Sequence, residues 1–277
     1  MSNLRIVYDN ATDRKSSLVA SSSAGSLGVN NLLTETKSQV WRSTSTSATL
    51  TIEWANAEFV GVVALPFCNF TSTATMRVRG YTGAADSVPV FDTGAKLCCA
   101  YTPFGLWGWG SQPLGVNAYS YGGATYAVVW FETTPVEKIV IDIDNTGNSS
   151  GYVEASRLVT GAYWSPENNC NYNARITTND MSKHGRTDSG DLKTDRGAMY
   201  KSIALDLSMM PSGDRNRLWD IIRGNGITRP IFFSLSPESD DPSEEQMFQI
   251  YGKLSRQLAI TYQFINQFNA PLEIEEV

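Results

Sequence analysis

The sequence has few of the side chains on which catalysis and metal binding most often depend. Its 277 residues include a single histidine, His184, and four cysteines, Cys68, Cys98, Cys99 and Cys170. One histidine excludes a histidine-rich metal site and leaves a Ser-His-Asp triad only one candidate base. The adjacent Cys98 and Cys99 match neither a CxxC pair nor the framework of a small secreted disulfide protein. We therefore expect no enzymatic activity, no metal and no cofactor. The thiols are expected to be buried or incidental, and His184 is expected to be exposed on a basic loop.

Positive charge and long apolar runs are scarce as well. The chain has 22 Lys and Arg against 28 Asp and Glu, a formal charge of −6, so no long-range attraction to nucleic acid or anionic membrane is expected. No apolar run has the length of a membrane span. The first residues lack the continuous apolar stretch of a signal peptide, which predicts synthesis in the cytoplasm.

The first part of the chain is rich in short segments typical of β-strands. These segments favour Val, Ile, Thr and aromatic residues and are separated by Gly, Asn, Asp or Pro. They comprise residues 48–54, 59–65, 74–81, 126–131 and 138–143. Met76 and Val78 alternate with Arg77 and Arg79, the period of a strand with one buried face. The pattern predicts a mainly β fold, with a β-sandwich or jelly roll over residues 1–165.

An aromatic, glycine-rich loop over residues 100–126 interrupts this sandwich. It carries the candidate contact residues Trp107, Trp109, Tyr119 and Tyr121. Such rings suit the energetic centre of a protein interface or a platform for a sugar ring. They would equally suit internal packing over one end of the sandwich, so three interpretations stay open.

The pattern changes after an irregular segment at residues 163–173, which predicts a second domain over residues 166–277. This domain is expected to be β-rich with one helix, at about residues 212–223. Leu218, Ile221 and Ile222 lie at helical spacing, Ser212 is the expected N-cap and Gly224 the expected terminator. Trp219 is expected to anchor the helix in the core. Strands are predicted at residues 202–208, 230–235, 249–254 and 258–266.

Two groups of carboxylates have simple structural interpretations. Residues 142–147 (DIDNTG) resemble the opening of a calcium loop, but Val153 stands where the closing glutamate belongs. A strand that ends in an Asn-rich turn is favoured. Residues 240–245 are expected to form an acidic loop or a short turn of helix. Their carboxylates, Asp240, Asp241, Glu244 and Glu245, are typical of a solvated acidic loop or a docking patch rather than of an acid-base pair. Arg77 and Arg79 suit a solvated face or a neighbour's carboxylate.

Several segments resemble known families. Asn31–Leu33, Val40–Ser43, Thr49–Trp54 and Val60–Leu65 resemble the galactose-binding-like, discoidin-type jelly roll, as do Met76–Tyr81 and Val90–Gly94. Gly190–Gly197, Leu218–Ile221 and Arg229–Leu235 resemble tail proteins of long-tailed bacteriophages.

This resemblance implies a structural component of the virion at the distal tail or tail tip (baseplate), synthesised in the host cytoplasm. Copies of the chain would assemble around the tail axis with tube, hub or other tail-tip proteins, and the second domain would dock on them. The alternative is a carbohydrate-binding module that assists adsorption to the host surface.

Overall fold

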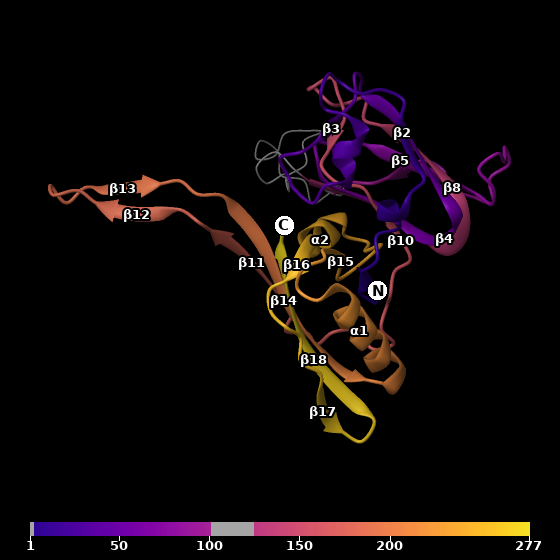
Figure 1. The fold of residues 1–277 in the computed structure, drawn as a ribbon. Coiled ribbons are helices and arrows are strands. Elements are labelled where there is room, and N and C mark those ends of the chain that lie inside the picture. The colour runs from indigo at the N-terminus through magenta and orange to yellow at the C-terminus, as the bar shows by residue number, and fades with distance from the viewer. Residues whose placement is uncertain (1–2, 101–124) are drawn as a thin grey trace. The chain divides into compact units, whose positions relative to one another are not determined.

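The computed structural model describes residues 3–100 and 125–277 and confirms the predicted mainly β fold (Figure 1). Its described residues form two compact units. Unit 1 comprises the described residues up to 166 together with 231–249, and unit 2 comprises residues 167–230 together with 250–277. The division expected from the sequence placed all of residues 166–277 in one domain. Residues 231–249 differ from that expectation because they pack with unit 1.

Unit 1 is built on two long, bent strands. Its elements in chain order are β1 (Arg5–Val7), η1 (Ala11–Arg14), β2 (Ser17–Ala20), η2 (Val29–Leu33), β3 (Trp41–Arg42), β4 (Ser47–Cys68), β5 (Thr75–Tyr81), β6 (Phe91–Asp92), β7 (Lys96–Leu97), β8 (Thr125–Asp144), β9 (Glu154–Ala155), β10 (Val159–Gly161), β15 (Ile231–Ser234) and α2 (Pro242–Met247). β4 and β8 pair antiparallel along most of their length. Each one joins two segments that the sequence predicts as separate strands.

A large bulge bends this pair. Glu53 pairs with Lys138 and Glu58 with Val136, so residues 54–57 of β4 oppose residue 137 alone. Extra residues on one strand bend it and increase its twist. The first half of β4 therefore pairs with β2, and the part of β8 beside it pairs with β5. The second half of β4 pairs with β10. One long pair thus contributes to both layers of a sandwich.

The core of unit 1 lies between the two halves of the bent pair. Leu50 and Ile52 come from the first half of β4, Val63 and Leu65 from the second, and all four are fully buried. Burying a side chain of this size contributes about 1.5–3 kcal/mol. Ile141 of β8 belongs to the same cluster. Burial alternates along the first half of β4, along most of β5 and along the last part of β8, and the fold confirms the β-sandwich that the sequence pattern predicts.

Unit 2 is a sheet with a helix against it. Its elements are β11 (Arg175–Asp180), β12 (Lys183–Arg186), β13 (Leu192–Asp195), β14 (Met199–Met210), α1 (Ser212–Asn225), β16 (Gln249–Leu254), β17 (Thr261–Phe264) and β18 (Gln267–Glu276). β18 pairs with β14, β16 and β17, and β14 pairs with β11, all antiparallel. α1 contacts β14 and β18, and Ile203, Leu205 and Ile274 of these strands are buried.

The ends of α1 differ from those predicted. The N-cap is Pro211, without a side-chain cap, and Ser212 is the first helical residue. The helix continues through Gly224 and ends at Asn225, where Gly226 adopts a left-handed φ of 54° and its N–H bonds to Ile222 O. A glycine tolerates this conformation at little cost, so it terminates the helix two residues later than expected.

The expected role of Trp219 is wrong. Leu218 and Ile221 are buried, as predicted, but Trp219 is 54% exposed. Successive helical residues are about 100° apart, so the residue after Leu218 turns away from the core face.

A second helix, α2, forms in the acidic segment. Asp241 caps it by accepting a hydrogen bond from Ser243 N–H at 2.9 Å, and Pro242 occupies the first turn. Both features favour a helix start. Across the two described stretches, no helix has the length and apolarity that a membrane span needs.

We expect Leu218→Ala to lower the free energy of unfolding by about 2–5 kcal/mol, the usual result of removing a buried leucine side chain. Trp219→Ala should change it by about 0.5 kcal/mol or less because the indole is mostly in solvent. Chemical denaturation followed by circular dichroism measures both. A larger loss for Trp219→Ala than for Leu218→Ala would contradict this assignment of the core face.

Candidate functional site

The four aromatic residues singled out by the sequence, Trp107, Trp109, Tyr119 and Tyr121, lie outside the described residues. Their roles as packing, interface or glycan-contact residues stay predictions. The described part of the chain offers two other features with functional potential, which are a cavity in unit 1 and a projecting ribbon in unit 2.

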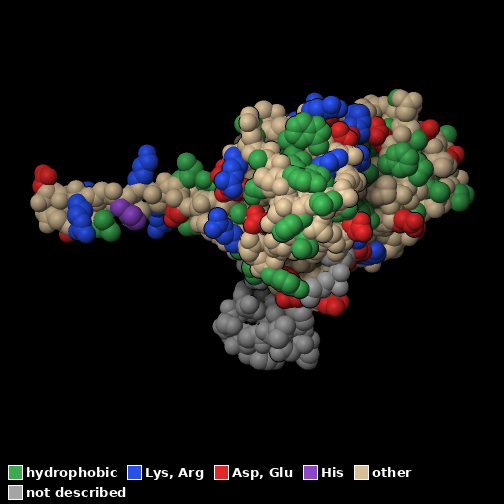
Figure 2. Space-filling view, turned by 90° about the horizontal axis from the view of Figure 1, so that it is seen from below, with side chains coloured by type: hydrophobic (Ala, Val, Ile, Leu, Met, Phe, Trp, Pro, Cys, Tyr) green, Lys and Arg blue, Asp and Glu red, His purple; other side chains and the backbone are tan. Residues whose placement is uncertain are grey.

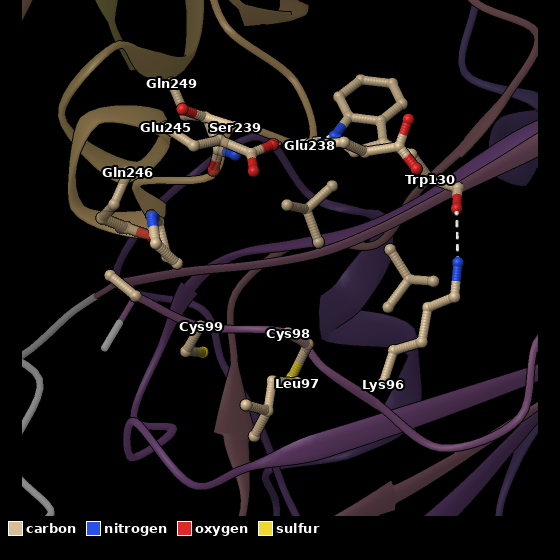
Figure 3. Close-up of a pocket in the computed structure, with 14 residues that line it drawn as sticks. Lys96, Leu97, Cys98, Cys99, Trp130, Glu238, Ser239, Glu245, Gln246 and Gln249 are labelled. Atoms are coloured by element: carbon tan, nitrogen blue, oxygen red, sulfur yellow. Dashed lines mark hydrogen bonds between the residues drawn. The ribbon is translucent and has the colours of Figure 1, made fainter. Parts of the chain in front are cut away.

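The cavity in unit 1 has a volume of about 330 Å³, which is at the lower end of the range for small-molecule sites. Its walls come from residues 96–100, residues 128–130 of β8, and residues 238–249 around α2 (Figure 3). The charged and amide side chains that line it are Lys96, Glu238, Glu245, Gln246 and Gln249. No sequence motif groups these residues, because they are brought together only when residues 231–249 pack on the sandwich.

Glu245 is a carboxylate in this cavity whose pKa is shifted. Its Oε1 accepts a hydrogen bond from the indole N–H of Trp130 at 3.0 Å, and Figure 3 shows its carboxylate directed toward Trp130. Burial raises the pKa of Glu245, although hydrogen bonds from Trp130, from the Glu238 backbone and from Gln249 partly oppose this rise. The expectation of a solvated cluster is therefore wrong for Glu245.

The other members of the acidic cluster behave differently. Asp240 is exposed, Asp241 caps α2, and Glu244 accepts hydrogen bonds from Ser236 and Ser239 at 3.4 and 3.3 Å. In a helix, adjacent residues point in different directions, so one of two neighbouring glutamates reaches the cavity.

Trp130 is held by aromatic and cationic neighbours as well as by Glu245. The guanidinium of Arg5 lies 5.1 Å from the Trp130 ring centroid and 4.5 Å from that of Tyr163. Arg5 also forms an ion pair with Glu238 at 2.9 Å. These contacts fix the β8 side of the cavity, and they leave the Trp130 ring buried rather than available as a stacking platform.

The thiols of Cys98 and Cys99 line the same cavity. Both residues are buried, as is Cys68. Burial raises the pKa of the Cys99 thiol well above its ordinary value, so the thiol form predominates and nucleophilic reactivity is low. Cys98 Sγ donates to Ala74 O at 3.4 Å. The prediction of buried thiols is confirmed for these three residues, and Cys170 is partly buried.

The charged strand residues of the sandwich are paired within the chain. Arg77 forms two hydrogen bonds to the carboxylate of Asp92, at 2.9 and 2.5 Å, and these lower the pKa of Asp92 to about 2. Arg79 pairs with Asp142 at 2.6 Å. Asp142, which the sequence compares with a calcium ligand, is therefore engaged by an arginine, and the described residues contain no cluster suited to hold a metal ion.

Neither of the two features that could suggest a serine hydrolase has the right setting. His184 is exposed on β12, where its Nδ1 lies 3.0 Å from the Thr194 hydroxyl. Gly147–Gly151 matches the pattern GxSxG around Ser149, but a turn and then β9 follow it instead of a helix. A nucleophile elbow requires a strand-turn-helix arrangement.

The ribbon of unit 2 consists of residues 175–204. Residues 175–180 of β11 pair with residues 199–204 of β14, and residues 183–186 of β12 pair with residues 192–195 of β13. All eight residues of β12 and β13 are exposed. Figure 1 shows these two strands extending beyond β11 and β14, and Figure 2 shows Lys and Arg side chains and the histidine on their surface.

We expect Glu245→Gln to raise the melting temperature at pH 7. A carboxyl group whose pKa is raised by folding favours the folded state only at low pH, and this contribution is lost as pH rises through the raised pKa. Glutamine keeps an acceptor for the Trp130 N–H without the buried charge. The difference should shrink in acid, as thermal denaturation across pH will show. If Glu245→Gln had a lower melting temperature at pH 7 than the neighbouring Glu244→Gln control, the raised pKa of Glu245 would be contradicted.

Comparison with known proteins finds no matching family model and no matching curated protein. Several of the similar solved structures are carbohydrate-binding modules. The CBM32 of AlyQ, solved with 4,5-unsaturated mannuronic acid, is 16% identical with a TM-score of 0.35, and the match covers 53% of this chain and 94% of that one. A chitosan-binding module from Paenibacillus sp. IK-5 is 12% identical with a TM-score of 0.37, covering 56% and 99%. A CBM32 from Clostridium perfringens, in complex with GalNAc-beta-1,3-galactose, is 9% identical with a TM-score of 0.38, covering 56% and 100%. Matches this distant do not assign a ligand to this chain.

Proposed function

We propose that this chain is a non-catalytic assembly protein that binds neighbouring protein chains through the ribbon of unit 2. The ribbon carries this proposal because β12 and β13 form a two-stranded sheet to which no other described strand pairs. A two-stranded hairpin is at best marginally stable alone in water. Its open edges offer unpaired N–H and C=O groups to a strand of another chain.

Exposed apolar side chains along the ribbon support a protein partner. Met181, Leu192 and Met199 are 62%, 57% and 60% exposed. Basic side chains, among them Lys183 and Arg186, stand beside them. Large apolar side chains amid polar ones are typical of surfaces that a partner covers.

A second hairpin of unit 2 is also exposed but is uncharged and rich in aromatic residues. β17 pairs with β18, and every residue of β17 is exposed. Near its turn, Tyr262, Phe264 and Ile265 are 63%, 62% and 83% exposed. The sequence has no charged residue from Gln257 to Leu272. Unit 2 therefore presents two exposed hairpins, a charged one formed by β12 and β13 and an uncharged aromatic one formed by β17 and the start of β18. Two surfaces of different chemistry suit contacts with two different neighbours.

In this proposal the partners are copies of the chain and other tail-tip proteins, such as tube or hub proteins, in the virion of a long-tailed bacteriophage. The resemblance of the sequence to distal tail proteins supports that setting. A ring of identical copies needs a heterologous contact, in which two different surfaces of the same chain meet. A projecting ribbon and a separate receiving surface satisfy this requirement.

Shortening the ribbon tests the proposal. Replacing residues 182–197 with Asn-Gly would close the hairpin by a two-residue turn after Met181, whose N–H bonds to Ala198 O. We expect the variant to fold but to stay monomeric at concentrations where the full chain forms oligomers, measured by light scattering after size exclusion. Lys183→Ala, which keeps the backbone of the ribbon, serves as the control. Oligomers of unchanged size in the shortened variant would contradict the proposal.

Particle assembly tests the tail-tip setting and the aromatic loop. Electron cryomicroscopy of virions that contain the chain should show a ring of density around the axis at the tail tip. We expect the double variant Trp107→Ala, Trp109→Ala to impair assembly if the loop is an interface. Normal particles from that variant would count against this role of the loop.

A second candidate function is carbohydrate binding during adsorption to the host. The cavity of unit 1 favours it, since carboxylate, amide and ammonium groups beside apolar walls suit a hydroxylated ligand. A glycan array probed with the full chain would show binding to a defined sugar. The absence of binding on the array and on the host's own surface polysaccharide would exclude this function.

A further inference from the structure

Glu245 is a partly buried carboxylate that forms no ion pair with another described side chain. Its hydrogen bonds come from neutral donors, which are the Trp130 indole, the Gln249 side chain and the Glu238 backbone. No ion pair among the described side chains includes it, whereas the nearby Glu238 is paired with Arg5. A buried carboxylate is costly unless a cation balances it.

Gln249 adds an independent unsatisfied acceptor. The residue is 1% exposed, lines the same cavity and has no hydrogen-bond partner at its Oε1 within the described part of the structure. Its side chain also bonds to Glu245, so the two groups are neighbours. Buried acceptors are rarely left without a donor in native proteins. Gln249 Oε1 therefore lacks a donor, and the neighbouring carboxylate of Glu245 lacks a cation.

The rest of the cavity wall is already satisfied or apolar. Lys96 stands across the cavity and donates to Trp130 O at 3.4 Å (Figure 3). Glu238 accepts from Arg5, and the hydroxyl of Ser239 donates to Glu244. Leu97 and Val129 supply apolar surface. The unsatisfied Gln249 Oε1 and the unbalanced charge of Glu245 thus lie on one side of the cavity, formed by α2 and the residue that follows it by two positions.

We propose that this cavity binds a primary ammonium group, R–NH₃⁺, with Glu245 as its ion-pair partner and Gln249 Oε1 as a second acceptor. An ammonium group carries three N–H donors and no acceptor, which matches this pair of groups. A metal ion is a poorer fit because the described residues contain no group of three His, Cys, Asp or Glu side chains that could hold one. The proposal is independent of the ribbon and goes beyond the assembly function.

Two sources present this chemistry, an amino sugar and the lysine side chain of a protein. Titration calorimetry of the full chain with D-glucosamine, N-acetyl-D-glucosamine and Nα-acetyl-lysine methylamide separates them. We expect an amine to bind and N-acetyl-D-glucosamine to bind at least about tenfold more weakly, since acetylation removes the charge. Preference for glucosamine indicates a sugar, and preference for the lysine probe indicates a protein partner.

Variants locate the site. Glu245→Gln should weaken amine binding at least about tenfold, while Glu244→Gln, on the same helix, should leave it unchanged. The affinity of the wild-type chain for the amine should decrease as the pH is lowered, because Glu245 becomes protonated. The shortened-ribbon variant should bind the amine normally, so failure of the assembly proposal leaves this test intact. Absence of amine binding, equal binding of N-acetyl-D-glucosamine or full binding by Glu245→Gln would overturn the proposal.

Discussion

The antiparallel pairing of β4 with β8 is the constraint on which the rest of unit 1 depends. The bulge at residues 54–57 lets a single pair of strands supply both layers of the sandwich, so β2, β9 and β10 join β4 and β5 joins β8. Trp54 lies in the bulge, is buried and donates its indole N–H to Ala11 O at 2.8 Å. The corner of the sandwich is therefore fixed by both packing and a directional bond. The same strand β8 then presents Trp130 to the cavity.

The cavity exists because a segment distant in sequence packs on this frame. β15 pairs with β1, and Phe232 and Phe233 of β15 are completely buried. The Phe232 ring lies 6.0 Å from that of Trp130. With β15 held in this way, α2 follows at a defined position and places Glu245 beside Trp130. Apolar packing of β15 thus positions α2, and the raised pKa of Glu245 is a consequence of that packing.

Sequence pattern predicted the parts of this fold that follow from local periodicity. Alternation identified the buried Met76 and Val78, and helical spacing identified Leu218 and Ile221. The prediction for Trp219 was wrong: hydrophobicity alone suggested burial, although the angle of about 100° between successive helical residues places the ring in solvent. The start of α2 has a local signal in Asp241 and Pro242, in agreement with the short turn of helix expected there as an alternative to a loop. The cavity had none, because Lys96, Trp130 and Glu245 meet only through tertiary packing.

The path of the chain between its units has a practical consequence. Arg5 and Glu238 form an ion pair although they are 233 positions apart, and the chain runs through residues 167–230 of unit 2 before it returns to complete unit 1. A recombinant fragment that stops at residue 165 would omit β15 and α2. It would expose the apolar surface that Phe232 and Phe233 normally cover, and such a fragment is prone to aggregate. Contacts this distant in sequence also slow folding, because much of the chain must be ordered before they form. Unit 1 is discontinuous in sequence, so deletion mapping with N-terminal fragments would report misfolding rather than the loss of a binding site.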